Sequence, residues 1–446
     1  MIPVYEISVN EKLTTEKLGD IIADYLTNRV QRMVKLEKYF LGKNDINQRV
    51  MADPLKPNNK IANGYANNIV NTITGYFMGN PVAYQFRTED ANEELFRNIL
   101  KNNNENRENS SLAQDASVFG FGAEIVYINE KAEISFDRMN PIGTIMIVDN
   151  SVSHKLKYVV KLDKVDTMPF LNYDDKYTAT VYDNTFETVY NYNNKVITLI
   201  GEREHMMRDI PVVIYKNNSE MMGDFEIVIS LIDAYDKLES DSLNDYEAFV
   251  DSYMVLQGMD LTAEEAAAMR ENRILLLPEG GNASWLTKAQ QDAYQENLKN
   301  RLDKDIYKFA NVVNMSDENF ANNLSGIAIQ YKLMGTENKC ATKQNFFDEG
   351  LRTRAGLINN ITTMFNSPIV LEEMTIIFSR NLPTNYADLA GIVNQLSSLV
   401  SKETLLGLLP FVEDVSAEME RKGEESEAAM AQFFEPTIED DNEEEV

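Results

Sequence analysis

The sequence has 446 residues, 43% of them hydrophobic, and a formal net charge of −29. That hydrophobic content is enough for a sizeable core, whereas so acidic a surface repels nucleic acid unless basic patches are segregated, so sequence-specific DNA reading is not expected. The single Cys340 excludes an intrachain disulfide and a cysteine-built zinc site. The start MIPVYEISVNEKL lacks the basic and apolar parts of a signal peptide, which predicts folding in the cytoplasm.

The amino-terminal part, up to about residue 110, shows the apolar spacing of helices. Its uncharged run from Ile61 to Phe86 is long enough to span a bilayer, but its asparagines and Pro81 argue against insertion, so no membrane contact is expected. Asparagines also recur at helical spacing opposite an apolar stripe: Asn59, Asn63, Asn67 and Asn71. Amides on a helix need partners outside it, which a flanking segment, another subunit or solvent could supply.

Alternating residues further along the chain predict strands. The stretch AEIVYINEKAEISFDRM indicates two strands about a polar turn, and residues 177–200 indicate three short strands. Together they predict an antiparallel sheet with one face in solvent. The NYDDKY and DNT clusters lack calcium-loop spacing and are interpreted as ordinary turns.

Two long helices are predicted next, over residues 222–257 and 289–312, joined by a compact excursion. The first is strongly acidic, with Lys237 as its single base, whereas the second carries Lys299, Lys304 and Lys308. The two helices are expected to pack together through this charge difference, although ordinary solvated faces remain an alternative. Short helices follow, and the acidic tail EDDNEEEV cannot bury enough surface to fold alone.

Catalytic patterns are missing. The sequence has no GxxxxGK[ST] run for phosphate binding, and His154 and His205 are its only histidines. Both histidines are interpreted as surface residues. No DxD or ExK cluster marks a carboxylate metal site. We therefore predict no catalytic residues, no metal and no cofactor.

Three stretches, in this order and spacing, resemble the portal, or head-to-tail connector, proteins of long-tailed double-stranded DNA bacteriophages. They are NKIANGYANNIVNTITGYFMGNPV, then IPVVIYKNNSEMMGDFEIVISLIDAYDKLESDSLNDYEAFVDSYMVLQG, then NLSGIAIQYKLMGTENKCATKQNFFDEGLRTR. The resemblance covers the chain from about residue 25 to 425. It implies a portal fold of the α+β class, mainly α, in a ring of about twelve subunits at one capsid vertex.

The resemblance also implies a division of the chain. The expected parts are a wing of helices and antiparallel sheet (1–221), a first stem helix (222–257), a clip (258–288), a second stem helix (289–312), a tunnel loop (313–325), the long wing helix and its return (326–382), crown helices (383–430) and a disordered acidic tail (431–446).

Candidate site residues follow from this division. The tunnel loop pointing into the DNA channel would comprise Met315, Ser316, Asp317, Glu318, Asn319, Phe320, Ala321, Asn322 and Asn323. Lys299, Lys304 and Lys308 would either form weak basic rings in the channel or, as we slightly favour, pair with the neighbouring acidic helix. The four asparagines would lie between subunits, and the clip would contact an adaptor through Arg270, Arg273, Glu279 and Trp285.

The implied function is structural and not enzymatic. Double-stranded DNA would pass through the ring without sequence specificity, pumped in by a separate terminase and later released into the tail. The other implied partners are a head-completion adaptor, the major capsid protein and a scaffolding protein, so the protein is expected in the virion and, during assembly, in the host cytoplasm. Two alternatives remain, a helical scaffold that forms no channel and a carboxylate-metal nuclease of the packaging machinery.

Overall fold

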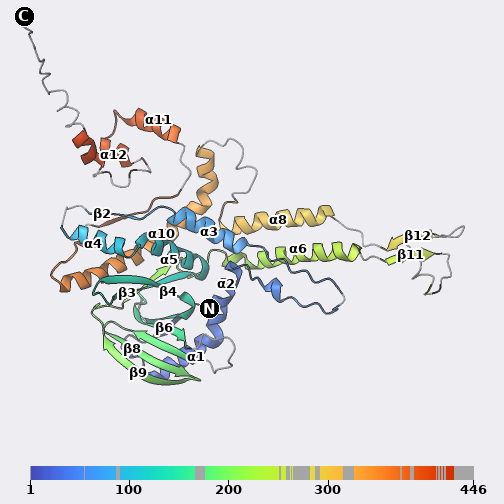
Figure 1. Ribbon diagram of the computed structural model, residues 1–446, viewed down its shortest axis with the longest axis horizontal. Helices are drawn as coiled ribbons and strands as arrows, with labels where there is room; N and C mark the ends of the chain where they lie inside the picture. The colour runs from blue at the N-terminus through green and yellow to red at the C-terminus, as the bar shows by residue number, and fades with distance from the viewer. Residues whose placement is uncertain are drawn as a thin grey trace, which may run out of the picture. The chain divides into compact units, whose positions relative to one another are not determined.

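The computed structural model divides into two compact units, Met1–Arg380 and Asn381–Val446 (Figure 1). The residues that the structure describes are 2–54, 56–86, 91–165, 176–250, 253–257, 262, 264, 282–286, 292–314, 326–371, 374–381, 386–407, 409, 412, 415 and 418–425.

The helices are α1 (Thr15–Asp24), α2 (Val30–Phe40), α3 (Tyr65–Met78), α4 (Ala91–Asn102), α5 (Glu105–Phe119), α6 (Ile229–Val250), α8 (Asp292–Ala310), α10 (Gly326–Met364), α11 (Tyr386–Leu396) and α12 (Lys402–Gly407). The strands are β1 (Val4–Ile7), β2 (Ala83–Gln85), β3 (Phe121–Ile128), β4 (Ile134–Met139), β5 (Thr144–Asp149), β6 (Leu156–Lys164), β7 (Lys176–Tyr182), β8 (Phe186–Asn193), β9 (Val196–Glu204), β10 (Val212–Lys216), β11 (Tyr253–Gln257), β12 (Asn282–Leu286) and β13 (Thr375–Ile377). This mixture of α and β structure agrees with the predicted class at that level.

The largest sheet has the strand order β1-β5-β6-β7-β8-β9. The predicted hairpin β3–β4 and the three predicted strands β7, β8 and β9 are confirmed, and all of these pairings are antiparallel. The sheet is not purely antiparallel, however, because β1 joins β5 in the parallel direction. Sequence pattern missed β1, since a four-residue strand carries too little alternation to be recognised.

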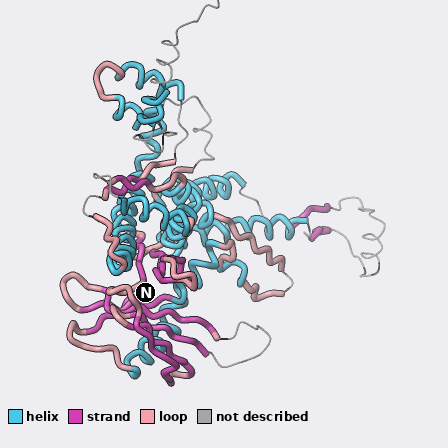
Figure 2. The backbone as a smooth tube through the Cα atoms, turned by 60° about the vertical axis from the view of Figure 1, so that its left-hand side comes forward, coloured by secondary structure: helices cyan, strands magenta, loops and turns pink. Residues whose placement is uncertain are grey.

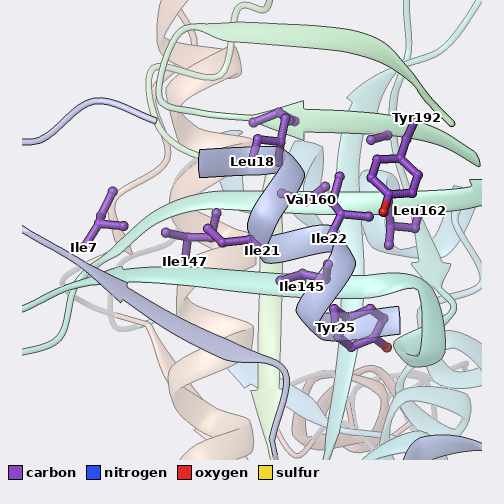
Figure 3. Packing of buried hydrophobic residues seen from close by; sticks show 12 residues of the cluster. Ile7, Leu18, Ile21, Ile22, Tyr25, Ile145, Ile147, Val160, Leu162 and Tyr192 are labelled. Atoms are coloured by element: carbon purple, nitrogen blue, oxygen red, sulfur yellow. The ribbon is translucent and has the colours of Figure 1, made fainter. Parts of the chain in front are cut away.

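Helix α1 covers one face of this sheet. Thr14 caps the helix by accepting a hydrogen bond from the Lys17 backbone N–H, and the apolar side chains of the first turns then point to the strands. Figure 3 shows Leu18, Ile21 and Ile22 packed against residues of β5 and β6 such as Ile145 and Val160. A π-helical turn, Tyr25–Arg29, joins α1 to α2.

A second layer carries the long helix α10. The sheet β10-β3-β4 packs against both α5 and α10, and α3 packs on these two helices (Figures 1 and 2). At 1.5 Å per residue, α10 is about 58 Å long. Gly350 is required here, because a Cβ at this position would lie 2.4 Å from the Tyr215 ring.

The predicted first long helix over 222–257 is too long. Helix α6 spans only Ile229–Val250, after a 3₁₀ turn at Glu226–Val228. Residues 253–257 instead form β11, which pairs with β12. The absence of Gly and Pro permitted a helix through YMVLQ, but pairing with another strand decided the outcome. The second long helix, α8, lies within the predicted 289–312.

The asparagine row is also not one helical stripe. Helix α3 begins at Tyr65, so Asn59 and Asn63 precede it. The backbone N–H groups of Asn59, Ile61 and Asn63 donate to side chains of α6, which a helix at these residues would not permit. Among the helices that the structure describes, none has the length and apolar character needed to cross a bilayer.

Candidate functional site

Helices α6 and α8 run side by side in opposite directions and end at the β11–β12 hairpin (Figure 1). Lys299 of α8 forms an ion pair with Glu239 of α6 at 3.0 Å, and the Ser242 hydroxyl contacts Gln295 at 3.4 Å. At the other end of the pair, the Tyr65 hydroxyl of α3 donates to Asp303 of α8 at 2.8 Å. The two helices therefore form one rod that is attached to the body.

The acidic residues of α6 are matched mainly by the amino-terminal segment and not by α8. Of the three candidate lysines, only Lys299 pairs with α6. Other partners of the acidic helix and its preceding turn come from α2 and the connector that follows it: Arg32 to Glu226 at 2.5 Å, the Tyr39 hydroxyl to Asp233, and Arg49 to Asp241 at 2.6 Å. The predicted ion pairing between the two helices thus occurs at one pair, Lys299 with Glu239. Other acidic residues of α6 and its preceding turn pair instead with α2 and the connector.

We call residues 58–64, the last part of that connector before α3, the strap. Its groups bond to α6 at 236, 240 and 244, one position per helical turn: Asn63 to Asp236 at 2.9 Å, the Ile61 N–H to Ser240 at 2.9 Å, and Asn59 to Asn244 at 3.0 Å. An extended segment thus runs along one stripe of α6. The sequence alone pointed to the asparagines but not to their partner helix.

The predicted location of the four asparagines between subunits remains a prediction. Their amides have partners in their own chain, because Asn67 donates to the Phe40 carbonyl at 3.2 Å and Asn71 donates to Asn67 at 2.7 Å. Asn67 finds its partner in a nearby segment, at Phe40 of α2, whereas the partners of Asn59 and Asn63 lie on α6, which is distant in the sequence. A neighbouring subunit is not needed to satisfy them.

Replacing Asn63 with alanine is expected to lower the free energy of unfolding by about 1–2 kcal/mol, because a hydrogen bond to the buried Asp236 carboxylate is lost. Asn71→Ala is the matched control, since among the described residues this exposed amide bonds to Asn67 alone, and its effect should stay within about 0.5 kcal/mol. Urea unfolding of both purified variants measures the difference. Equal effects would show that the strap does not hold α6.

A buried ion-pair cluster joins the base of this rod to α10. Asp224, which precedes α6, accepts from Lys343 at 2.9 Å and lies 3.3 Å from Lys339. The Lys339 ammonium also donates to the Asp224 carbonyl at 3.0 Å and to the Ala310 carbonyl at the end of α8 at 2.9 Å. One lysine therefore ties the beginning of the α6 segment and the end of α8 to α10.

The electrostatics of this cluster favour the ionised carboxylate. Burial of Asp224 opposes its charge, but Lys343, Lys339 and the bonds from Lys343 and Asn217 outweigh burial and lower its pKa. A polar pocket of about 410 Å³ lies beside the cluster, lined by Asn217, Asn218, Asp224, Asn311, Gly335, Asn338, Lys339, Thr342 and Lys343. The pocket walls are thus the segments that meet at the rod's base.

A second buried cluster fixes the other half of α10. Arg354 donates to both carboxylate oxygens of Glu124 in β3 at 2.8 Å, and to Asn109 of α5 at 2.9 Å. Glu105 accepts from Arg354 at 3.3 Å and also from the Tyr84 hydroxyl. Burial raises the pKa of Glu124, although Arg354 opposes that rise. Sequence reasoning missed this cluster, because its members come from α5, β3 and α10 and no spacing in the sequence links these three elements.

Asp115 of α5 is a buried carboxyl near the same sheet. Arg138 contacts one of its oxygens at 3.2 Å, while the other oxygen is buried and makes no hydrogen bond. Burial raises the pKa of Asp115 from 3.8 to about 7 despite Arg138.

The raised pKa of Asp115 predicts a pH dependence of stability. Between pH 4 and 7 the folded state holds a proton that the unfolded state has lost, so stability falls as the pH rises. The expected loss from this group between pH 5 and 7 is about 2 kcal/mol. Asp115→Asn should flatten this part of the profile in chemical unfolding series, and an unchanged slope would contradict the assignment.

The outer flank of α8 is basic. Arg301, Lys304 and Lys308 are exposed and recur at spacings of three and four, which places them on one face. Arg301 contacts Asp305 at 3.7 Å, and Lys308 lies 5.6 Å from the ring centre of Phe309. Neither Lys304 nor Lys308 forms an ion pair with another described residue. The favoured pairing with the acidic helix therefore applies to Lys299 alone.

Other predicted site residues lie outside the described residues. These are the tunnel-loop candidates of 315–323, the clip candidates Arg270, Arg273 and Glu279, and the acidic tail of 431–446. The backbone at Trp285 belongs to β12. In the part of the chain that the structure describes, no group of three or more His, Cys, Asp or Glu side chains is placed to hold a metal ion.

Comparison with known proteins identifies the family of this chain. The family model described as phage portal protein, SPP1 Gp6-like, matches residues 20–432. The chain belongs to this portal protein family. A portal protein of Bacillus phage SPP1 is 23% identical over 476 aligned residues, which cover 93% of this chain and 90% of the relative. A portal protein of Clostridium phage phiCD119 is 22% identical over 437 residues, covering 90% of this chain and 93% of the relative.

The match to the portal family includes the rod of α6 and α8, both buried clusters and the whole of α10. The family resemblance inferred from three stretches of sequence is thereby confirmed. Within this portal chain, the described helices on either side of residues 315–325 are α8 and α10, and Lys339 of α10 donates to the Ala310 carbonyl of α8.

Proposed function

We propose that this portal chain is one subunit of a ring-shaped channel at a single capsid vertex, through which double-stranded DNA enters during packaging and leaves into the tail. Family membership over most of the chain supports a capsid portal role. The observation that carries the channel is the rod of α6 and α8, because its outer flank presents basic residues that have no acidic partner on α6.

The channel would guide DNA without holding it. With a net charge of −29 per chain, a ring of such subunits repels phosphates over most of its surface, so few sites allow the counterion release that makes DNA adhere. Lys304 and Lys308 would face the lumen as weak basic rings, one helical turn apart, and lower the barrier to DNA entry locally. Residues 315–323 would line the narrowest part, with Asp317, Glu318, Asn319 and Phe320 nearest to DNA.

The remaining partners are proposed from the same assignment. A terminase would supply the energy for DNA entry, and an adaptor would bind the clip through Arg270, Arg273, Glu279 and Trp285. The wing would contact the major capsid and scaffolding proteins. The subunits would number about twelve, in a closed ring built from one repeated heterologous contact.

Electron images of the purified, assembled protein test this function. Rings with a central opening are expected, and native mass should give about a dozen chains per particle. Assembled virions that contain only one or two copies of this chain would overturn the proposal.

Charge reversal tests the lumen assignment separately. The double variant Lys304→Glu with Lys308→Glu is expected to form rings but to pass DNA severalfold more slowly at low salt, because the barrier to phosphate rises. The difference should vanish near 1 M salt, where the Debye length is about 3 Å. Lys12→Glu with Lys131→Glu makes the same charge change at exposed positions of the body and serves as control. Equal rates of DNA passage for both double variants would contradict the assignment of Lys304 and Lys308 to the lumen.

A further inference from the structure

The strap contains the only Asn-Gly pair of the sequence, Asn63 with Gly64. In such a pair the backbone nitrogen of the glycine can attack the side-chain carbon Cγ of the asparagine, because no Cβ hinders its approach. A five-membered ring forms as the Cγ–Nδ2 bond breaks, and ammonia leaves with the proton of the attacking nitrogen. Water then opens the ring, so the products are ammonia and either aspartate or isoaspartate.

The fold does not require the glycine of this pair. The backbone angle φ of Gly64 is −80°, which any residue adopts, and a Cβ placed there would meet no other heavy atom within 4 Å. Gly64 is exposed, and its N–H forms no hydrogen bond with another described residue. The nitrogen that would attack is therefore accessible to solvent and unbonded.

The other reacting groups are held while the strap lies on α6. The Nδ2 amide of Asn63, which would leave, donates to Asp236 at 2.9 Å, and the Asn63 backbone N–H donates to the same oxygen at 2.9 Å. The Asn63 carbonyl, which shares one peptide plane with the Gly64 nitrogen, accepts from Asn44 at 3.1 Å. Rotation of this plane or of the side chain breaks at least one of these bonds, so the contact with α6 restrains ring closure.

Asp236 determines what the modification does to the strap. Its side chain is 0% exposed, and in the described structure its carboxylate accepts from neutral groups, the amides of Asn63 and the Asn44 Nδ2 at 2.5 Å. Aspartate at position 63 loses the donor and brings a second negative charge to a carboxylate that has no cation among the described residues. Isoaspartate also adds one backbone atom between the strap and α3. Both products therefore oppose the return of the strap to α6.

We propose that this Asn-Gly pair is a spontaneous modification site that the strap controls. While residues 58–64 lie on α6, Asn63 persists. When they detach, ring closure converts Asn63 to aspartate or isoaspartate, with water as the only co-reactant, and the strap then stays off α6. The modification marks chains whose strap has opened, and it does not depend on the proposed ring or channel.

Peptide mapping of the full-length protein by mass spectrometry tests the proposal. In mildly alkaline buffer, native protein is expected to lose the Asn63 amide at least about tenfold more slowly than the same protein unfolded in guanidinium, since the reaction requires the strap to open. Gly64→Ala should slow the reaction in both states, because its Cβ hinders the attacking nitrogen. Equal rates at Asn63 in native and unfolded wild-type protein overturn the proposal.

Two variants test whether the strap contact itself controls the rate. Asp236→Ala removes the acceptor of the Asn63 amide, and Ser240→Ala removes an acceptor one helical turn further along α6. Each should raise the rate at Asn63 in native buffer severalfold. The internal reference is Asn109, a buried asparagine whose amide is held by hydrogen bonds within the body. If both variants leave the rate at Asn63 unchanged, or raise it equally at Asn109, control by the strap is refuted.

Asn63→Asp tests the consequence of the modification. Hydrogen exchange at neutral pH should be at least about tenfold faster than in the wild type for the backbone amides of residues 61 and 63, which bond to α6 in the unmodified strap. Adding Asp236→Asn removes one of the two carboxylates and should restore part of the protection. Wild-type exchange in Asn63→Asp would show that the modified strap remains on α6 and would contradict the proposed consequence.

Discussion

Replacing Arg354 with methionine is expected to lower the free energy of unfolding by about 3–5 kcal/mol, the largest effect of any single substitution considered for this chain. Arg354 and Glu124 are both buried, and their two bonds of 2.8 Å satisfy the carboxylate. Methionine fills similar space but leaves the Glu124 charge without its cation. The Tyr215 hydroxyl, which donates to Glu124 at 2.9 Å, cannot replace that charge.

Arg352→Met is the matched control on the same helix. Arg352 is half-exposed and pairs with Asp348 four residues earlier, so its loss should change stability by no more than about 0.5 kcal/mol. Adding Glu124→Gln to Arg354→Met should recover part of the loss, since Glu124 is then neutral and Glu105 alone of the two carboxylates lacks its cation. Guanidinium unfolding followed by circular dichroism measures all three variants. Similar values for Arg352→Met and Arg354→Met would contradict the buried-cluster account.

Replacing Lys343 with methionine is expected to cost about 3 kcal/mol and to loosen the base of the α6–α8 rod. The buried Asp224 carboxylate would retain only Lys339, at 3.3 Å, and the bond from Asn217 at 2.9 Å. The lowered pKa of Asp224 means that its contribution to stability is present above pH 3.8 and is lost as the pH falls toward its folded value. Removal of Lys343 takes away that contribution at neutral pH.

The readout for Lys343→Met combines unfolding with local hydrogen exchange. Amides near Asp224 and at the end of α8 should exchange faster than in the wild type, whereas amides in the six-stranded sheet should not change. Lys304→Met, at an exposed lysine of α8, controls for the loss of a positive charge. The double variant with Asp224→Asn should be more stable than Lys343→Met alone. A uniform loss of protection across the chain would argue against a local anchor.

Local pattern predicted the elements whose signal lies within a few residues. The hairpin β3–β4 and the strands β7 to β9 alternate strongly, and α8 carries a regular apolar stripe, so their own sequences determine them. The end of α6 was predicted wrongly because YMVLQ is compatible with helix and strand alike. Its partner β12 lies beyond the excursion and could not be inferred from YMVLQ itself.

The candidate site, too, was predicted from the sequence only in part. The charge contrast between the two long helices is visible in sequence, yet only Glu239 and Lys299 realise it. The asparagine row correctly indicated a need for hydrogen-bond partners. Only the three-dimensional structure shows that these partners are Asp236, Ser240 and Asn244. In the sequence, the strap and α6 are separated by the strands β2 to β10, so no local pattern connects them.

The sequence by itself determined the family, the acidic character and the presence of two long helices, because these depend on composition, local periodicity and the order of segments. Only the tertiary structure decided which charges meet inside the protein: Lys343 with Asp224, and Arg354 with Glu124 and Glu105. It also decided that the Arg29 guanidinium meets the carbonyls of Ile2 and Val4 beside the first strand of the largest sheet. The physical reason is that an ion pair or a strand edge depends on distance in space, and residues far apart in the chain carry no local record of that distance.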